Sequence, residues 1–190
     1  IHDRLTRLIA LFSSLPDTHL TEAMIERKVK ELIEREALGV GETLWPMRVA
    51  LSGRKESPGP FTLAAVRGAD IVVTLTPSRR PLVLRAWLSP GVHINAVGAD
   101  APGKQELDPR ILRDAIVVVD ERKQAIHGGE LNVPVACGQF HPRRIRASLG
   151  EVLLGRKRGR RSAADVTVFD STGLAIHDVV MGAELVRLAA

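Results

Sequence analysis

The chain has 190 residues, of which 45% are hydrophobic and 26% charged, so it can bury a core as one domain or two small ones. No apolar run reaches the roughly 18 residues of a membrane-spanning helix, and charges within the first apolar segment argue against a signal peptide. The net charge of +5 permits a polyanionic partner, and the single cysteine, Cys137, excludes an internal disulfide and favours a reducing, cytoplasmic setting.

Residues 1–60 have the periodicity of helices. The first apolar positions recur at helical spacing until Pro16-Asp17 breaks the pattern: Ile1, Leu5, Leu8, Ile9 and Phe12. Thr21 has the side chain and position of a helix N-cap, and an apolar stripe follows it between residues 25 and 33. We expect Gly39 to end this second helix. The turn-rich segment 52–60, SGRKESPGP, marks the best boundary in the chain.

From about residue 62 short apolar runs alternate with helical patterns. Four runs rich in valine and isoleucine predict strands, at residues 70–76, 91–97, 115–120 and 165–170. The segments LDPRILRDA and GLAIHDVVMGAELVRLAA predict helices, the second of which closes the chain. We therefore predict an α/β protein, with an N-terminal helical segment followed by a partial Rossmann-like parallel sheet flanked by helices, containing three or four strands.

Three turns lie beyond the carboxyl ends of the predicted strands, where open parallel sheets bind ligands. They are TPSRRP (76–81), GADAPGK (98–104) and DSTG (170–173). In the second turn, Asp100 has the chemistry of a general base, and Lys104 that of a contact for a phosphate or hydroxyl group. A solvated turn with no function is the alternative. The six histidines contain no H-x-x-x-H pair, so the sequence predicts no zinc site.

Residues 64–190 resemble the second half of the ornithine cyclodeaminase/mu-crystallin family, which includes NAD-dependent alanine dehydrogenases of the archaeal type. The matching text is GADIVVTLTPSRRP, WLSPGVHINAVGADAPGKQELD, DAIVVVD, LGEVLLGRKRGR and VTVFDSTGLAIHDV. The resemblance implies that Asp100 is the catalytic acid/base, that NAD or NADP is the cofactor and that Thr172 contacts a small amino or imino acid substrate. It implies cofactor contacts from Thr74, Val97, Gly98, Ala99, Lys104 and Ser171.

The Gly-rich phosphate loop of that family lies earlier in the chain than the resembling region. The one candidate here, residues 39–44 (GVGETL), lacks the third glycine and follows a helical pattern instead of a strand. The lysine and arginine that grip the substrate carboxylate in the family also lie upstream. We therefore expect this chain to be incomplete and weakly active or inactive alone.

Residues 1–61 resemble the last helical part of the anticodon-binding region of bacterial glutamyl-tRNA synthetases, through TEAMIERKVKELIEREALGVGETLWPMRVALSGRKESPGPF. The resemblance implies that anticodon bases of a tRNA contact Arg48, Ser57, Pro58 and Phe61. The alternative places Trp45, Val49 and Leu51 in the core, with Arg48 as a surface charge. The signatures of a synthetase catalytic domain are absent from this sequence, which excludes tRNA ligation by this chain alone.

The sequence thus predicts two segments, 1–61 and 62–190, with three interpretations. The first is an NAD(P)-dependent protein acting on a small amino or imino acid, and the second is a tRNA- or RNA-binding module. The third is an engineered or computed chimera without activity. The basic run 155–161 could meet RNA phosphates or be a solvated loop. We expect the run 70–76 to form an open sheet edge that recruits a second copy of the chain, giving a homo-oligomer.

Overall fold

The computed structural model describes residues 2–15, 21–52 and 59–189. The chain divides into two compact units. The helical unit comprises Ile1–Asp70 with Ala86–Ser89, and the sheet unit comprises Ile71–Arg85 with Pro90–Ala190. Among the described residues, no helix combines the length and apolarity that a membrane span needs.

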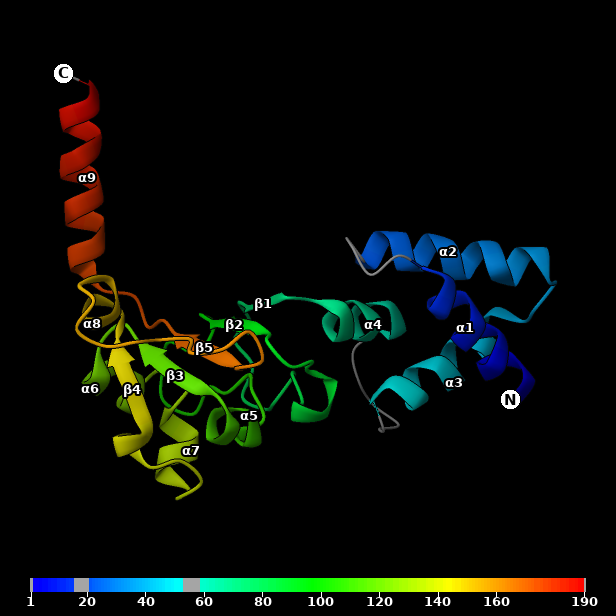
Figure 1. Ribbon diagram of the computed structural model, residues 1–190, viewed down its shortest axis with the longest axis horizontal. Helices are drawn as coiled ribbons and strands as arrows, with labels where there is room; N and C mark the ends of the chain where they lie inside the picture. Colours follow the sequence, from blue (N-terminus) through cyan, green and yellow to red (C-terminus); the bar gives the residue numbers. More distant parts are fainter. Residues whose placement is uncertain (1, 16–20, 53–58, 190) are drawn as a thin grey trace. The chain divides into compact units, whose positions relative to one another are not determined.

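The helical unit contains α1 (His2–Ser14), α2 (Glu22–Arg35), α3 (Val40–Ser52) and α4 (Pro60–Gly68) (Figure 1). The predicted N-cap is confirmed, because the Thr21 hydroxyl accepts a hydrogen bond from the Met24 amide. The apolar stripe of α2 supplies most of the core, which contains Leu8, Ile25, Val29, Leu32, Ile33 and Met47.

The predicted end of α2 at Gly39 is wrong, because the helix ends at Arg35. Ala37 takes the left-handed conformation, with φ of 50°, that a glycine would adopt more easily. The Leu38 amide then donates to the Ile33 carbonyl at 2.9 Å, and the Leu38 side chain packs against the core. Because the Leu38 side chain packs against the core, the turn that follows α2 lies at Ala37, two residues before Gly39.

The sheet unit contains five parallel strands, β1 (Ile71–Thr74), β2 (His93–Ala96), β3 (Ile116–Val119), β4 (Ile145–Ser148) and β5 (Thr167–Asp170), in the order β1-β2-β5-β3-β4. The four predicted strands and the α/β class are confirmed. The predicted total of three or four strands is too low, because the described sheet has five. The sequence did not indicate β4, because its residues, IRAS, include an exposed arginine on an edge strand. The predicted edge position of β1 is also confirmed.

A row of apolar side chains sets the register of the sheet. Val72 is paired with Ile94, Ile94 with Val168, and Val168 with Val117. All four are buried, and a shift of one residue would move them to the other face. The same register aligns the last residues of four strands at one edge: Thr74, Ala96, Asp170 and Val119.

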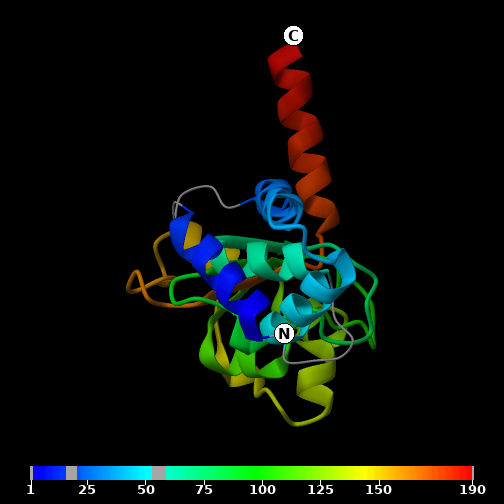
Figure 2. The same cartoon turned by 90° about the vertical axis from the view of Figure 1, so that its right-hand side faces the viewer.

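Short helices connect the strands of the sheet unit. They are α5 (Pro109–Asp114), α6 (Arg122–His127), α7 (Asn132–Ala136) and α8 (Leu149–Leu153), with 3-10 turns at Arg85–Trp87 and Pro142–Arg144. The predicted closing helix is confirmed as α9 (Ala175–Ala189). It extends away from the sheet in both views, and its side chains are exposed along its whole length (Figures 1 and 2).

Candidate functional site

The carboxyl edge of the sheet brings together the turns that follow β1, β2 and β5. The amide of Val97, after β2, donates to the Thr74 carbonyl at 3.0 Å, and the amide of Ser171, after β5, donates to the Ala96 carbonyl at 2.9 Å. Backbone hydrogen bonds therefore join the turns after β2 and β5 to the ends of the neighbouring strands β1 and β2. Ligands of open parallel sheets bind at this edge, which makes it the candidate site.

Asp100 is an exposed carboxylate on the turn after β2. The Lys104 ammonium forms an ion pair with the Asp100 carboxylate. This hydrogen bond and the lysine charge lower the pKa of Asp100, so the group is ionised at neutral pH. An ionised carboxylate that solvent can reach is able to accept a proton, as the predicted acid/base role requires.

The side chain of Asn132, at the start of α7, holds the far end of the same turn. The Gly103 amide donates to the Asn132 side-chain oxygen at 2.8 Å, and the Asn132 side-chain nitrogen donates to the Lys104 carbonyl at 2.9 Å. Gly103 has a φ of 81°, which a side chain would make unfavourable. The turn that carries Asp100 is thus fixed at its end.

Thr74, the last residue of β1, has a buried side chain. Its hydroxyl oxygen is buried and has no hydrogen-bond partner among the described residues. Buried hydroxyl groups are normally paired, because an unpaired one costs about 1–3 kcal/mol. A polar atom of a ligand bound at this edge would supply the hydrogen-bond partner that the Thr74 hydroxyl lacks.

A buried carboxylate that the sequence analysis did not single out joins two of the turns. Glu106 accepts hydrogen bonds from the Thr76 amide at 2.6 Å, from the Thr76 hydroxyl at 2.7 Å and from the Gly98 amide at 3.0 Å. Gly98 has no room for a side chain, since a Cβ atom there would lie 2.7 Å from the Glu106 carboxyl carbon. Glu106 therefore holds the turn after β1 against the turn after β2.

Two more buried carboxyl groups continue this arrangement toward β5. Glu130 accepts hydrogen bonds from the amides of Glu106 at 3.0 Å and Leu107 at 2.7 Å. Asp170 accepts one from the Glu130 amide at 3.0 Å. Burial raises the pKa of Glu130 to about 8 and that of Asp170 to about 7. The only sequence signal is that acids stand next to apolar or glycine residues, as in QELD and GGEL.

The turn after β5 is held by Asp120. The Thr172 amide and hydroxyl donate to the Asp120 carboxylate at 2.6 and 3.0 Å, and the Gly173 amide donates to it at 2.9 Å. The hydroxyl of Thr172, which the resemblance assigns to the substrate, is therefore engaged with Asp120. Ser171 lies beside Thr172 and is half-buried, and Ala99, a predicted cofactor contact, is fully buried.

Two of the four predicted RNA contacts belong to described parts of the helical unit. Arg48 is half-buried on α3, and Phe61 belongs to α4. Ser57 and Pro58 lie outside the described residues. Of the residues that the alternative places in the core, Trp45 is wrong, since it is 50% exposed, whereas Leu51 packs against the core.

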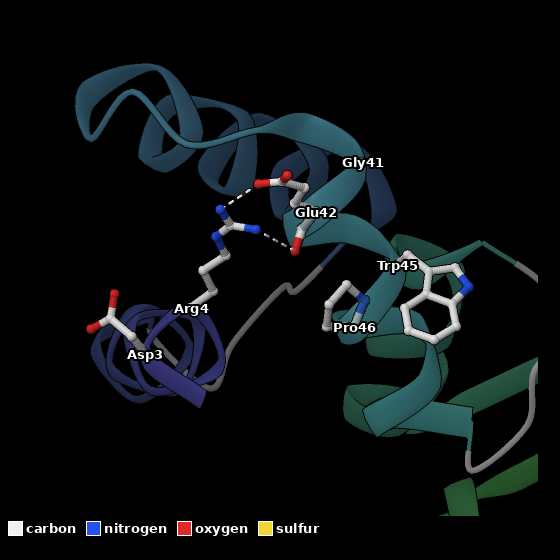
Figure 3. Close-up of a pocket in the computed structure, with 6 residues that line it drawn as sticks. All are labelled: Asp3, Arg4, Gly41, Glu42, Trp45 and Pro46. Carbon is white, nitrogen blue, oxygen red and sulfur yellow. Dashed lines mark hydrogen bonds and ion pairs between the residues drawn. The ribbon is translucent and has the colours of Figure 1, made fainter. Parts of the chain in front are cut away.

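Trp45 lines a hollow of about 590 Å³ between α1 and α3, which the sequence analysis did not predict. Figure 3 shows Arg4 of α1 reaching toward Glu42 of α3, with Trp45 and Pro46 further along α3. Arg4 forms an ion pair with the Glu42 carboxylate and donates to the Glu42 carbonyl at 3.2 Å. The hollow thus combines an aromatic surface with a charged pair. Arg48 is not among the residues that line it.

Parallel strands whose turns gather at their aligned carboxyl ends define an α/β protein of the class whose ligands bind at that edge of the sheet. The chain belongs to the ornithine cyclodeaminase/mu-crystallin family, whose model matches residues 62–188. The model described as an anticodon binding domain matches residues 1–74. The predicted resemblances to these two families are therefore confirmed.

The relatives that the chain matches include proteins named as an alanine dehydrogenase and as Delta(1)-pyrroline-2-carboxylate reductases. The alanine dehydrogenase of Archaeoglobus fulgidus is 54% identical over 112 residues, which is 59% of this chain and 35% of that protein. A solved archaeal alanine dehydrogenase dimer with bound NAD has a TM-score of 0.58 and 55% identity, covering 58% of this chain and 35% of its own.

The Delta(1)-pyrroline-2-carboxylate reductase of Thermococcus litoralis, solved with NADH and L-proline, has a TM-score of 0.60 and 32% identity. That match covers 63% of this chain and 37% of the reductase. The chain therefore spans little more than a third of the length of the relatives that it matches.

Proposed function

We propose that the sheet unit forms part of an NAD(P)-dependent site that acts on a small amino or imino acid. The observation that carries this proposal is Asp100, an exposed carboxylate kept ionised by Lys104 on a turn at the carboxyl edge of the sheet. The relatives support it, because an alanine dehydrogenase and a pyrroline-2-carboxylate reductase match this unit.

The residues at the edge fit such a cofactor. The Thr74 hydroxyl is a buried polar atom without a partner, and the turn after β2 presents Val97 and Gly98 beside it. We assign cofactor contacts to Thr74, Val97, Gly98, Ala99, Lys104 and Ser171. The nicotinamide cofactor, when bound, would supply the hydride acceptor or donor.

Asp100 would move the proton that accompanies hydride transfer at the substrate α-carbon. The bond with Lys104 lowers the pKa of Asp100 further below its ordinary value, so Asp100 starts as an ionised base. Thr172 would lie beside the substrate, oriented by Asp120. Residues 39–44 begin α3 in the helical unit, so they cannot act as a phosphate loop after a Rossmann strand. We therefore propose weak or no turnover by this chain alone, in a reducing cytoplasmic setting.

The experiment measures NAD and NADP binding by isothermal titration calorimetry, and turnover with alanine, ornithine and proline. Asp100→Asn should remove most of any turnover while cofactor affinity and melting temperature stay close to those of the parent. Glu184→Gln, an exposed change on α9, is the matched control. Turnover that survives in Asp100→Asn would overturn the acid/base role, and absence of cofactor binding by the parent would overturn the site.

A second candidate function is RNA binding by the helical unit, which the anticodon-binding match over residues 1–74 favours. We propose base contacts from Arg48, Ser57, Pro58 and Phe61, since an arginine and an aromatic ring can stack on unpaired bases. Titration with a glutamate tRNA across a salt series tests this. Arg48→Ala should weaken binding, whereas equal binding of an unrelated tRNA would indicate charge attraction alone.

We also propose that the chain associates through β1. This edge strand pairs with β2 on one side only within the described sheet. Ile71 and Val73 are 62% and 53% exposed, so the strand offers apolar side chains as well as free backbone groups. One solved relative is a dimer. Light scattering over a concentration series should show a dimer or larger species.

A further inference from the structure

We propose that Glu106 is the positioning residue of the nucleotide-binding edge. This inference rests on the proposed NAD(P) site and deepens that proposal. Glu106 would act through the two turns that it holds, without touching cofactor or substrate. The turn after β1 follows Thr74, and the turn after β2 carries Asp100, so one buried side chain controls the placement of both.

The contacts of the Glu106 carboxylate are divided between the two turns. One oxygen accepts both the Thr76 amide and the Thr76 hydroxyl, and the other accepts the Gly98 amide. Glu106 is fully buried, so water does not replace these donors. All three donors are neutral, and a carboxylate gains most from such an array when it is ionised.

The backbone of Glu106 is itself fixed, so that its side chain has a defined starting point. Its amide donates to the Glu130 carboxylate at 3.0 Å, and its carbonyl accepts the amides of Leu82 at 2.6 Å and Val83 at 3.0 Å. Gly98 is the complementary feature, because a Cβ atom there would collide with Thr76 and with the Glu106 carboxyl group. The Glu106 carboxyl group fits in this place only because residue 98 is a glycine.

Glu106→Gln is the informative change because it keeps the shape and replaces one acceptor by a donor. If the amide oxygen keeps the two Thr76 donors, the new NH₂ group faces the Gly98 amide, and two donors then oppose each other. If the group is flipped, the same conflict falls on Thr76. Either way one turn loses its bond to Glu106, and the Gly98 amide keeps only its second acceptor, the Thr74 carbonyl at 3.1 Å. The apolar row through Ile94 and Val168 is untouched.

The test combines hydrogen exchange of individual amides, measured by NMR, with NAD titration by calorimetry. Glu106→Gln should accelerate exchange by about tenfold or more at whichever of the Thr76 and Gly98 amides faces the new NH₂ group, and weaken NAD binding by a similar factor. Exchange at Ile94 and Val168 should stay as in the parent. Glu184→Gln, an exposed change of the same chemistry, should alter none of these.

Uniformly faster exchange over all strands would show that Glu106 is a general stabiliser and would overturn the proposal. So would unchanged NAD affinity together with a released Gly98 amide. If Glu106→Gln does not fold, Thr76→Val, which removes one of the three donors, should produce the same local pattern more weakly, and its absence would also overturn the proposal. If the parent binds no NAD, the proposed function fails, and the exchange pattern alone decides whether Glu106 fixes the turns.

Discussion

The buried carboxyl group of Glu130 should make the sheet unit less stable as the pH rises from about 5 to 8. Burial raises the pKa of Glu130 from an ordinary 4.5 to about 8, and the neighbouring charge of Asp170 adds to the increase. The folded unit therefore holds a proton that the unfolded chain has released. Because the folded form binds more protons between these two values, the free energy of unfolding falls as the pH rises through them. Below the unfolded pKa the stability is fully present.

The size of this effect follows from the difference between the two pKa values. Each pH unit within the window lowers the free energy of unfolding by up to about 1.4 kcal/mol, so Glu130 alone removes about 3 kcal/mol between pH 5 and 8. Asp170, whose burial raises its pKa to about 7, acts in the same direction. Asp100 and Asp165 have lowered pKa values, so their stabilising contributions are lost only as the pH falls below about 4.

Glu130→Gln should remove most of the Glu130 contribution, because an amide stays neutral throughout the range. Native-state hydrogen exchange at the Ile94 and Val168 amides measures the stability of the sheet unit itself. Intrinsic fluorescence does not, since both tryptophans, Trp45 and Trp87, belong to the helical unit. Comparing the variant with the parent at the same pH cancels the intrinsic exchange chemistry.

Relative to the parent, the variant should gain about 3 kcal/mol between pH 5 and 8, a change of about 100-fold in the ratio of exchange rates. Glu184→Gln, at an exposed position, should keep a constant ratio. A stability difference between Glu130→Gln and the parent that is equal at pH 5 and pH 8 would refute the reasoning. It would mean that the amides bonded to Glu130 keep it ionised in the folded protein.

Three further changes test separate parts of the structure. Gly98→Ala should destabilise the sheet unit by about 1–3 kcal/mol, because its Cβ atom would lie 2.3 Å from the Thr76 amide nitrogen. Gly150→Ala, with nothing within 4 Å of its new Cβ atom, is the control in thermal unfolding by circular dichroism, and equal melting temperatures would contradict the clash. Ile25→Ala should cost the helical unit about 2–5 kcal/mol in urea unfolding followed by tryptophan fluorescence, and a loss below 1 kcal/mol would be too small for a core position. Val73→Lys should shift the oligomer toward monomer in light scattering, whereas an unchanged mass would place the interface elsewhere.

The four strands that the sequence predicted share one physical property. Each contains valine or isoleucine with a buried side chain, and in β1, β2 and β3 the buried positions alternate, as at Ile94 in β2. The fifth strand, β4, lies at an edge and contains Arg146, so its composition resembles that of a loop. β1 is an edge strand too, but its exposed positions are Ile71 and Val73, so the difference lies in the polar residues Arg146 and Ser148 of β4.

The turns of the site were predictable, whereas the groups that hold them were not. Asp100 and Lys104 stand four residues apart on a glycine-containing turn, and their contact is local. Glu106 bonds to Thr76, 30 residues earlier, and Asp170 bonds to the Glu130 amide, 40 residues away. Whether an acid is solvated or buried against backbone amides depends on such distant partners, which composition and spacing do not specify.

The buried carboxylates connect the last strand of the sheet to the first. Asp170, at the end of β5, holds the backbone of Glu130, and Glu130 holds the backbone of Glu106. Glu106 in turn holds Thr76 and Gly98, beyond β1 and β2. The side chain of each acid therefore fixes the backbone of the residue whose own carboxyl group makes the next contact. Burial raises the pKa values of Glu130 and Asp170 toward neutrality, so these two acids change their charge near neutral pH. The amides of Glu106 and Leu107 donate to the Glu130 carboxyl group, and such bonds are kept when the group ionises. The stability of the sheet unit should therefore decline as the pH approaches 8, whereas the contacts of Glu106 with Thr76 and Gly98 should be kept.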